Sequence, residues 1–151
     1  MIAYRFSSKQ FIADLSGEGA RLYGGRWNHK GIPALYTSLT ISLALLELLI
    51  HSASYDEIKN NVFAIIELPD KDIVEINTSG LKKNWWTDEA YTKYIGSEFL
   101  KNKETLLMKI PSAIIPEEYN IVINPLHPNF KRVKLKEVKD FIFDARLFKE
   151  L

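Results

Sequence analysis

Residues 24 to 31 read GGRWNHKG and place an arginine, a tryptophan and an asparagine between closely spaced glycines. Glycine permits positive backbone φ and lets a ligand approach the main chain closely. Arginine can hold a phosphate or a carboxylate through two parallel hydrogen bonds. The stretch therefore predicts a loop that binds an anionic ligand beside a large aromatic ring.

The surrounding sequence predicts one domain of mixed secondary structure. Residues 16 to 33 carry five of the chain's seven glycines and are expected to form a long loop or a broken hairpin. A helical turn or short helix is predicted over residues 8–15. Longer helices are predicted over residues 40–53, with Ser38 or Thr40 as cap, and 87–102, with Thr87 or Asp88 as cap. Strands are predicted over residues 2–6, 34–37, 61–68, 72–76, 106–110, 112–116 and 119–124, and residues 131–151 carry mixed signals. Because these elements alternate without a regular βαβ rhythm, the expected class is α+β, as a single compact domain over residues 1–151.

Composition excludes several classes of protein. The chain has 151 residues, a net charge of +1 and no cysteine, so it offers no disulfide, no thiol chemistry and little attraction for a nucleic acid. Its longest apolar run, ISLALLELLI at 41–50, is too short to span a membrane and contains Glu47. The first residues do not resemble a signal peptide. A cytoplasmic protein without direct nucleic-acid or membrane binding is expected.

Glu47 is an unusual residue for its position in the predicted helix. Its helical neighbours Ala44, His51 and Ser54 are small or polar, while the other positions are mostly leucine and isoleucine. A carboxylate in such surroundings is usually paired, solvent-facing or functional. Glu47 and His51 alone make a poor metal site, and no metal is expected.

Three further positions allow more than one interpretation. Ser112 follows a proline without a G-x-S-x-G motif, so taken alone it is a turn serine. Tyr36 ends a predicted strand, where an aromatic ring commonly belongs to the core. Trp85 and Trp86 could form a lid, a partner surface or simple packing.

Taken in order, six segments of the chain resemble the RES domain family. They are YRF (4–6), GGRWNHKG (24–31), ALYTS (34–38), SLALLELLIH (42–51), PSAIIPEEYNIVINPLHP (111–128) and FIFDARLF (141–148). The resemblance covers nearly the whole chain. It implies a fold similar to that of ADP-ribosyltransferases, and a toxin of a bacterial toxin–antitoxin pair that attacks NAD.

The same resemblance assigns roles to individual residues. The family's Arg, Glu and Ser correspond to Arg26, Glu47 and Ser112, with Tyr36 as a supporting aromatic. An additional basic position corresponds to Arg5, and the neighbours of Arg26 that would contact NAD are Gly25, Trp27 and Asn28. An Xre-type antitoxin is the implied partner, and we expect it to cover the active site with a carboxylate on Arg26 or Arg5. Its expected aromatic anchors are Trp27, Trp85 and Trp86.

Cleavage of the nicotinamide–ribose bond suits this set of residues. The bond breaks through an oxocarbenium-like cation, as in glycoside hydrolysis, but nicotinamide leaves as a neutral molecule and needs no general acid. One carboxylate, Glu47, is then sufficient to offset the developing charge. The chain has neither a Rossmann nor a Walker motif, so NAD is expected as a consumed substrate, with inorganic phosphate as a conceivable co-substrate and no bound cofactor.

Other functions remain open at this point. The chain could transfer ADP-ribose to a host protein, or it could be a non-catalytic nucleotide-binding or interaction module. A ribonuclease using His29, His51 and His127 is a further alternative, although the sequence places no two of them together. Self-association is also left open.

Overall fold

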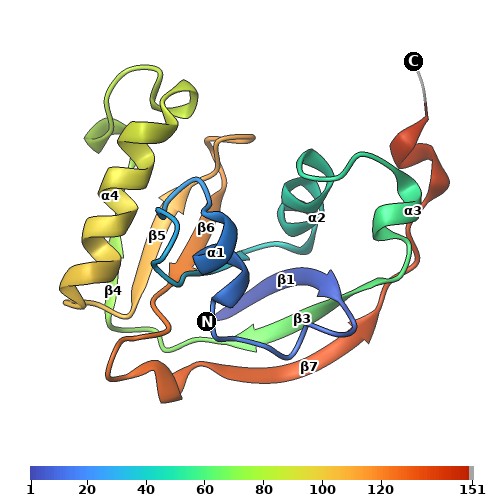
Figure 1. Ribbon diagram of the computed structural model, residues 1–151, viewed down its shortest axis with the longest axis horizontal. Coiled ribbons are helices and arrows are strands. Elements are labelled where there is room, and N and C mark those ends of the chain that lie inside the picture. Colours follow the sequence, from blue (N-terminus) through green and yellow to red (C-terminus); the bar gives the residue numbers. More distant parts are fainter. Residues whose placement is uncertain (150–151) are drawn as a thin grey trace.

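The computed structural model describes residues 1–149 (Figure 1). The strands are β1 (Ile2–Ser8), β2 (Leu35–Ser38), β3 (Asn61–Glu67), β4 (Ile73–Glu75), β5 (Leu107–Pro111), β6 (Tyr119–Ile123) and β7 (Lys134–Asp140). The helices are α1 (Glu18–Tyr23), α2 (Ile41–Ile50), α3 (Tyr55–Ile58) and α4 (Glu89–Asn102), with 3-10 turns η1 (Thr78–Gly80), η2 (Trp85–Thr87), η3 (Phe130–Arg132) and η4 (Ala145–Phe148). No helix within residues 1–149 is both long enough and apolar enough to cross a membrane.

The strands form one mixed sheet of seven, in the order β4-β5-β6-β2-β1-β3-β7. Among residues 1–149 only β4 and β5 run parallel, so this part of the chain has no repeated βαβ unit, and the predicted α+β class is confirmed. The sheet narrows in its middle, because β1 and β2 pair only at Tyr4 and Ser38, whereas β1 pairs with β3 along its whole length. Figure 1 shows the consequence: β5 and β6 run steeply, while β1, β3 and β7 run across the view.

The core divides into two clusters, which follow the alternation of side chains along the strands. One cluster includes Ala3, Leu35 and Ile121, and the other includes Trp27 and Val122. In the second cluster the sheet packs against side chains of η2 and α4, namely Trp85, Phe99 and Leu100.

The helix that carries Glu47 begins where the sequence predicts. Thr40, one of the two expected caps, accepts a hydrogen bond from the Leu43 backbone N–H at 3.1 Å. The helix ends at Ile50, before the predicted residue 53, and α3 follows after Ser54. Asp88 caps α4 in the same manner, by accepting from the Tyr91 N–H at 3.0 Å.

Two local predictions are wrong. Residues 112–116 are not a strand, because the Ser112 hydroxyl accepts from the N–H groups of Ile114 and Ile115 and folds the segment into a turn. Residues 16–33, predicted as a long loop or a broken hairpin, contain the helix α1. The helix tolerates Gly19, which lies at an exposed position. The prediction of a helical turn after β1 is confirmed, because residues 9–13 form turns and the Ile12 N–H donates to the Ser8 carbonyl at 2.9 Å, without extension into a short helix.

Candidate active site

Two clusters of polar side chains lie on the same face of β2. Tyr36 and Ser38 are separated by one residue, so they project to the same side, roughly 7 Å apart along the strand. Thr37 between them points to the opposite side and donates to the Ile121 carbonyl. Tyr36 contacts the turn that contains Arg26, and Ser38 contacts the residues around Glu47. One short strand thereby sets the spacing between the two clusters.

The first cluster is centred on the Glu47 carboxylate. The Ser112 hydroxyl donates to Glu47 Oε1 at 3.1 Å, and the Asn120 amide donates to the same oxygen at 2.6 Å. Ser38 donates to Asn120 Oδ1 at 2.7 Å. The structure thus brings together the predicted residues Glu47 and Ser112, although they are far apart in sequence.

Glu47 has no cationic partner among residues 1–149. Its side chain is half-buried, and its described hydrogen bonds come from neutral groups. The interpretation of Glu47 as a carboxylate pinned by a structural arginine is therefore wrong. A half-buried carboxylate without a counter-ion can respond to positive charge on a bound molecule.

Ser112 is a turn serine, and its hydroxyl also contacts Glu47. Its hydroxyl oxygen accepts from two backbone N–H groups, and its side chain is fully buried. The hydroxyl hydrogen is then directed to Glu47. The turn that follows β5 is what places this serine against the helix.

Asn120 is a member of the cluster that the sequence interpretation missed. It occupies the second position of β6 and lies directly opposite Ser38 on β2. The available signal was an asparagine near the start of the strand-like run YNIVIN, on the same face as Val122. Only the strand pairing shows that this amide reaches Glu47.

The second cluster is the turn of residues 25–28, which we call the arginine turn. Gly25 and Asn28 exchange backbone hydrogen bonds of 3.1 and 3.4 Å, so Arg26 and Trp27 form its tip. Thr92 of α4 donates to the Arg26 carbonyl at 2.8 Å, and the Arg26 guanidinium donates to the Trp86 carbonyl at 3.1 Å. Arg26 is half-buried, with N–H groups left over for a ligand.

Tyr36 holds the arginine turn against the sheet. Its hydroxyl donates to Asn28 Oδ1 at 2.7 Å and accepts from the Trp27 N–H at 2.9 Å. Burial raises the pKa of Tyr36, and the Trp27 hydrogen bond and the positive charge of Arg26 partly oppose this increase. The hydroxyl is therefore already occupied, and only the ring remains available for stacking on a ligand.

Three residues predicted to contact NAD have structural roles in the loop. The Asn28 side chain is fully buried, and its amide donates to the carbonyls of Ala20, His29 and Ile32. Trp27 is 2% exposed and packs against Trp85. A Cβ on Gly25 would lie 2.7 Å from the Tyr36 hydroxyl, so glycine is required there by internal packing.

Arg5 lies apart from both clusters. Its guanidinium donates to the carbonyls of Ile12 and Asp14, which anchors the loop after β1. Alternation along β1 places it on the face opposite Tyr4, and Tyr4 shares its face with Ser38. Burial lowers the pKa of Arg5, and the nearby Asp14 carboxylate opposes this.

The remaining candidates are dispersed. Trp85 is buried, while Trp86 is 44% exposed and is the one predicted anchor of the three that lies open on the surface. His29 and His51 are exposed, whereas His127 is buried, where its Nδ1 accepts from the Asn129 N–H. The structure therefore provides no histidine pair in support of a ribonuclease.

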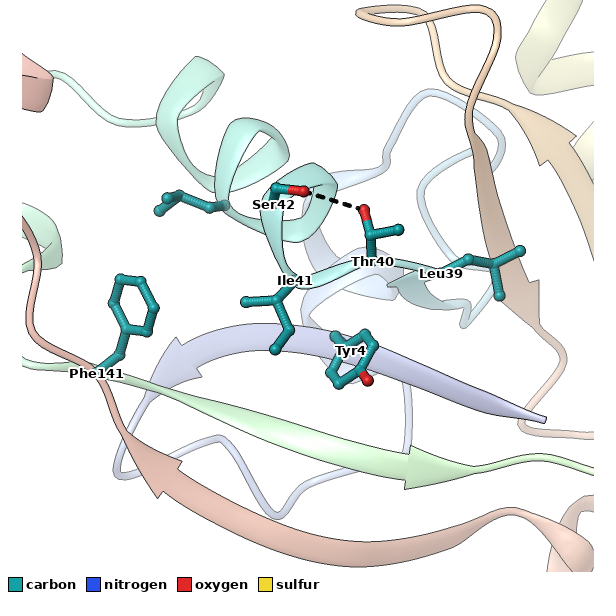
Figure 2. A pocket seen from close by; sticks show the side chains of 7 residues that line it. Tyr4, Leu39, Thr40, Ile41, Ser42 and Phe141 are labelled. Atoms are coloured by element: carbon teal, nitrogen blue, oxygen red, sulfur yellow. Dashed lines mark hydrogen bonds between the residues drawn. The ribbon is translucent and has the colours of Figure 1, made fainter.

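A cavity of about 560 Å³ lies on the other side of α2 (Figure 2). Its lining includes Tyr4, Ile41, Leu45 and Phe141, all largely apolar. Leu45 and Glu47 are separated by about 200° around the helix axis. The cavity therefore does not include the Glu47 carboxylate.

The fold and the two clusters define a single-domain α+β protein built on one mixed sheet. The RES domain model matches residues 2–144, and the chain belongs to the RES domain family. It is similar to Toxin Res of Yersinia enterocolitica (serotype O:8 / biotype 1B), with 36% identity over 152 residues, covering 97% of this chain and 99% of that protein. It is also similar to the Prs ADP-ribosylating toxin of a Sphingobium species, with 37% identity over 142 residues, covering 91% and 88% of the two chains.

A solved structure has the same fold at lower sequence identity. The crystal structure of the M. tuberculosis MbcT–MbcA toxin–antitoxin complex contains a chain that matches with a TM-score of 0.73 and 19% identity, covering 93% of this chain and 84% of that chain. The family match and the relatives' names class the chain as a RES-type toxin, and it shares its fold with the matched chain of this complex.

Proposed function

We propose that this toxin acts in the cytoplasm and cleaves NAD at the nicotinamide–ribose bond, as a phosphorylase or a glycohydrolase. In either reaction the C–N bond breaks, nicotinamide leaves with the electron pair, and an oxygen of phosphate or water bonds to the ribose carbon. The positive charge that was on the nicotinamide ring develops on the sugar during this step.

The observation that carries the proposal is the Glu47 carboxylate. It is half-buried, has no ion-pair partner among the described residues, and is held by two hydrogen bonds from neutral groups. A preorganised carboxylate in such surroundings is suited to stabilise a cation that exists only in the transition state. An Arg–Glu pair would cancel this charge before substrate bound.

The arginine turn supports the same proposal from the other end of the substrate. Arg26 is fixed through its carbonyl and one N–H group, and its remaining donors match the geometry of a pyrophosphate. Tyr36 places this turn at a constant distance along β2 from Glu47. Arg5, anchored on the opposite face of β1, is the weaker candidate for the phosphate.

The test is incubation of the purified protein with NAD, with and without phosphate, followed by identification of the products. Release of nicotinamide is expected, and the second product distinguishes the two reactions. Phosphate-dependent release with a phosphorylated ADP-ribose indicates a phosphorylase, and free ADP-ribose indicates a glycohydrolase. Intact NAD would contradict the proposal.

A second candidate is transfer of ADP-ribose to a protein. It is favoured by the name of the Sphingobium relative, an ADP-ribosylating toxin. With adenine-labelled NAD and a cell extract, transfer would leave the label on a protein band, whereas phosphorolysis or hydrolysis would leave it in a small molecule.

We also propose an Xre-type antitoxin that covers the arginine turn. Trp86 is exposed, and its carbonyl accepts from the Arg26 guanidinium, so an aromatic anchor and a cation lie side by side. A carboxylate of the antitoxin would then pair with Arg26. Trp86→Ala should weaken the complex, measured by titration with the antitoxin, while Tyr94→Ala, on the exposed outer side of α4, should not.

A further inference from the structure

We infer that Asn120, oriented by Ser38, is a positioning residue that determines which oxygen of Glu47 faces the substrate. The inference rests on the proposed cleavage of NAD. It assigns a role to two residues that lie outside the predicted Arg–Glu–Ser set.

Both hydrogen bonds to Glu47 converge on the same oxygen. Ser112 and Asn120 donate to Oε1, and no residue of the described chain donates to Oε2. Within residues 1–149, no buried side-chain oxygen or nitrogen lacks a partner, so the unpaired Oε2 must reach the surface. The carboxylate is therefore asymmetric, with one oxygen held inside and one presented outward.

The orientation of the Asn120 amide follows from its neighbours. A carboxylate accepts hydrogen bonds but donates none, so the NH2 group must face Glu47 and the carbonyl must face away. Ser38 donates to that carbonyl at 2.7 Å and holds the amide in the orientation that Glu47 selects. The Ser38 hydroxyl thus acts on Glu47 only through Asn120.

The sheet itself sets this arrangement. Ser38 and Asn120 are directly opposed across the antiparallel β2–β6 pair, and opposed side chains lie on the same face at close range. Glu47 is then placed over Asn120 by α2, which packs against β1 and β2. The paired strands therefore fix the position of the reactive oxygen, and they are more rigid than a loop.

The experiment measures kcat, KM and thermal stability for substitutions at the two positions. Asn120→Asp is nearly isosteric and keeps an acceptor for Ser38, but it places a second carboxylate against Glu47. We therefore expect its kcat to fall by roughly 100-fold or more. Asn120→Ala should lower kcat by roughly 10- to 100-fold with KM little changed, because a misplaced reacting group costs about this much. Ser38→Ala should lower kcat only a few-fold.

A double-mutant cycle separates positioning from general stability. Because Ser38 acts through Asn120, the Ser38→Ala/Asn120→Ala double variant should have the kcat of Asn120→Ala alone. The matched control is Thr37→Val, which removes the buried hydrogen bond to Ile121 on the other face of β2. It should lower the unfolding temperature without changing kcat.

Each alternative result contradicts either the positioning role of Asn120 or the proposed cleavage of NAD. If wild type cleaves NAD and Glu47→Gln does not, but Asn120→Ala keeps its kcat, the inference fails and the proposed function stands. An increase in KM in place of the kcat loss would make Asn120 a substrate-binding residue and overturn the positioning role, as would equal kcat losses in Thr37→Val and Asn120→Ala. A wild-type protein that leaves NAD intact would overturn both.

Discussion

The Glu47 cluster and the arginine turn both depend on β2, but they differ in how much of their hydrogen-bonding capacity is used. In the turn, Asn28 is fully buried with its amide and carbonyl paired, and the Tyr36 hydroxyl is paired twice. In the Glu47 cluster, one carboxylate oxygen remains free. The difference teaches that a ligand-like motif can be mostly scaffold, with free hydrogen-bonding capacity confined to Arg26, while a single glutamate in a leucine-rich helix keeps one oxygen free for the proposed chemistry.

The largest expected effect comes from the reactive side of this comparison. Glu47→Gln keeps the shape of the side chain and an oxygen that can accept from Ser112 and Asn120, but it loses the negative charge. We expect nicotinamide release to fall on the order of 10²–10³-fold with the unfolding temperature unchanged. In cells, wild type should arrest growth and deplete NAD, while Glu47→Gln should be tolerated. Harmless accumulation of wild type with NAD unchanged would contradict the toxin's proposed activity.

Gly25→Ala tests the scaffold side. The added Cβ would lie 2.7 Å from the Tyr36 hydroxyl and 2.8 Å from Asn28 Oδ1, so we expect a loss of roughly 1–3 kcal/mol in the free energy of unfolding. Gly19→Ala is the matched control, since a Cβ there meets nothing within 4 Å and the residue lies in α1. It should stabilise the protein by roughly 0.5–1 kcal/mol. Equal effects at both positions would mean that Gly25 has no special packing role.

Tyr36→Phe should destabilise the protein by about 1–2 kcal/mol, because the Trp27 N–H and Asn28 Oδ1 lose their partner. It also has a pH signature. The folded-state pKa of Tyr36 is raised above its ordinary value of about 10, so its contribution is fully present below pH 10 and is lost as pH rises further. The free energy of unfolding, measured with denaturant, should therefore fall more steeply above pH 10 for the wild type than for Tyr36→Phe. Parallel curves would contradict the buried-phenol interpretation.

The smallest expected effect is that of Arg26→Lys. Lysine keeps the charge but loses the planar fork, so NAD should bind several-fold more weakly. Lys30→Arg is the reference substitution, at an exposed position close to the turn, and should leave binding unchanged. If the two variants bind NAD alike, Arg26 is not the phosphate-binding residue and Arg5 must be reconsidered.

Much of this molecule could be predicted from the sequence, because local rules determine it. The α+β class and the start of α2 at its Thr40 cap follow from sequence patterns. The choice of Glu47 and Ser112 as site residues follows from the family resemblance, and the structure adds that their side chains are hydrogen-bonded. The roles of Asn28 and Trp27 could not be predicted, because the sequence of a glycine-rich loop does not show whether its side chains face a ligand or the core. Asn120 was missed for a related reason: its contact with Glu47 depends on the register of β6 against β2, between segments about 80 residues apart in the chain.

The most direct test of the division between reactive group and scaffold is kcat for nicotinamide release, measured side by side for Glu47→Gln and Tyr36→Phe and normalised to folded protein. We predict a loss of about 100-fold or more for Glu47→Gln and a loss of only a few-fold for Tyr36→Phe. The opposite order, with Glu47→Gln near wild type and Tyr36→Phe inactive though folded, would contradict the assignment of the chemistry to Glu47 and place it in the arginine turn.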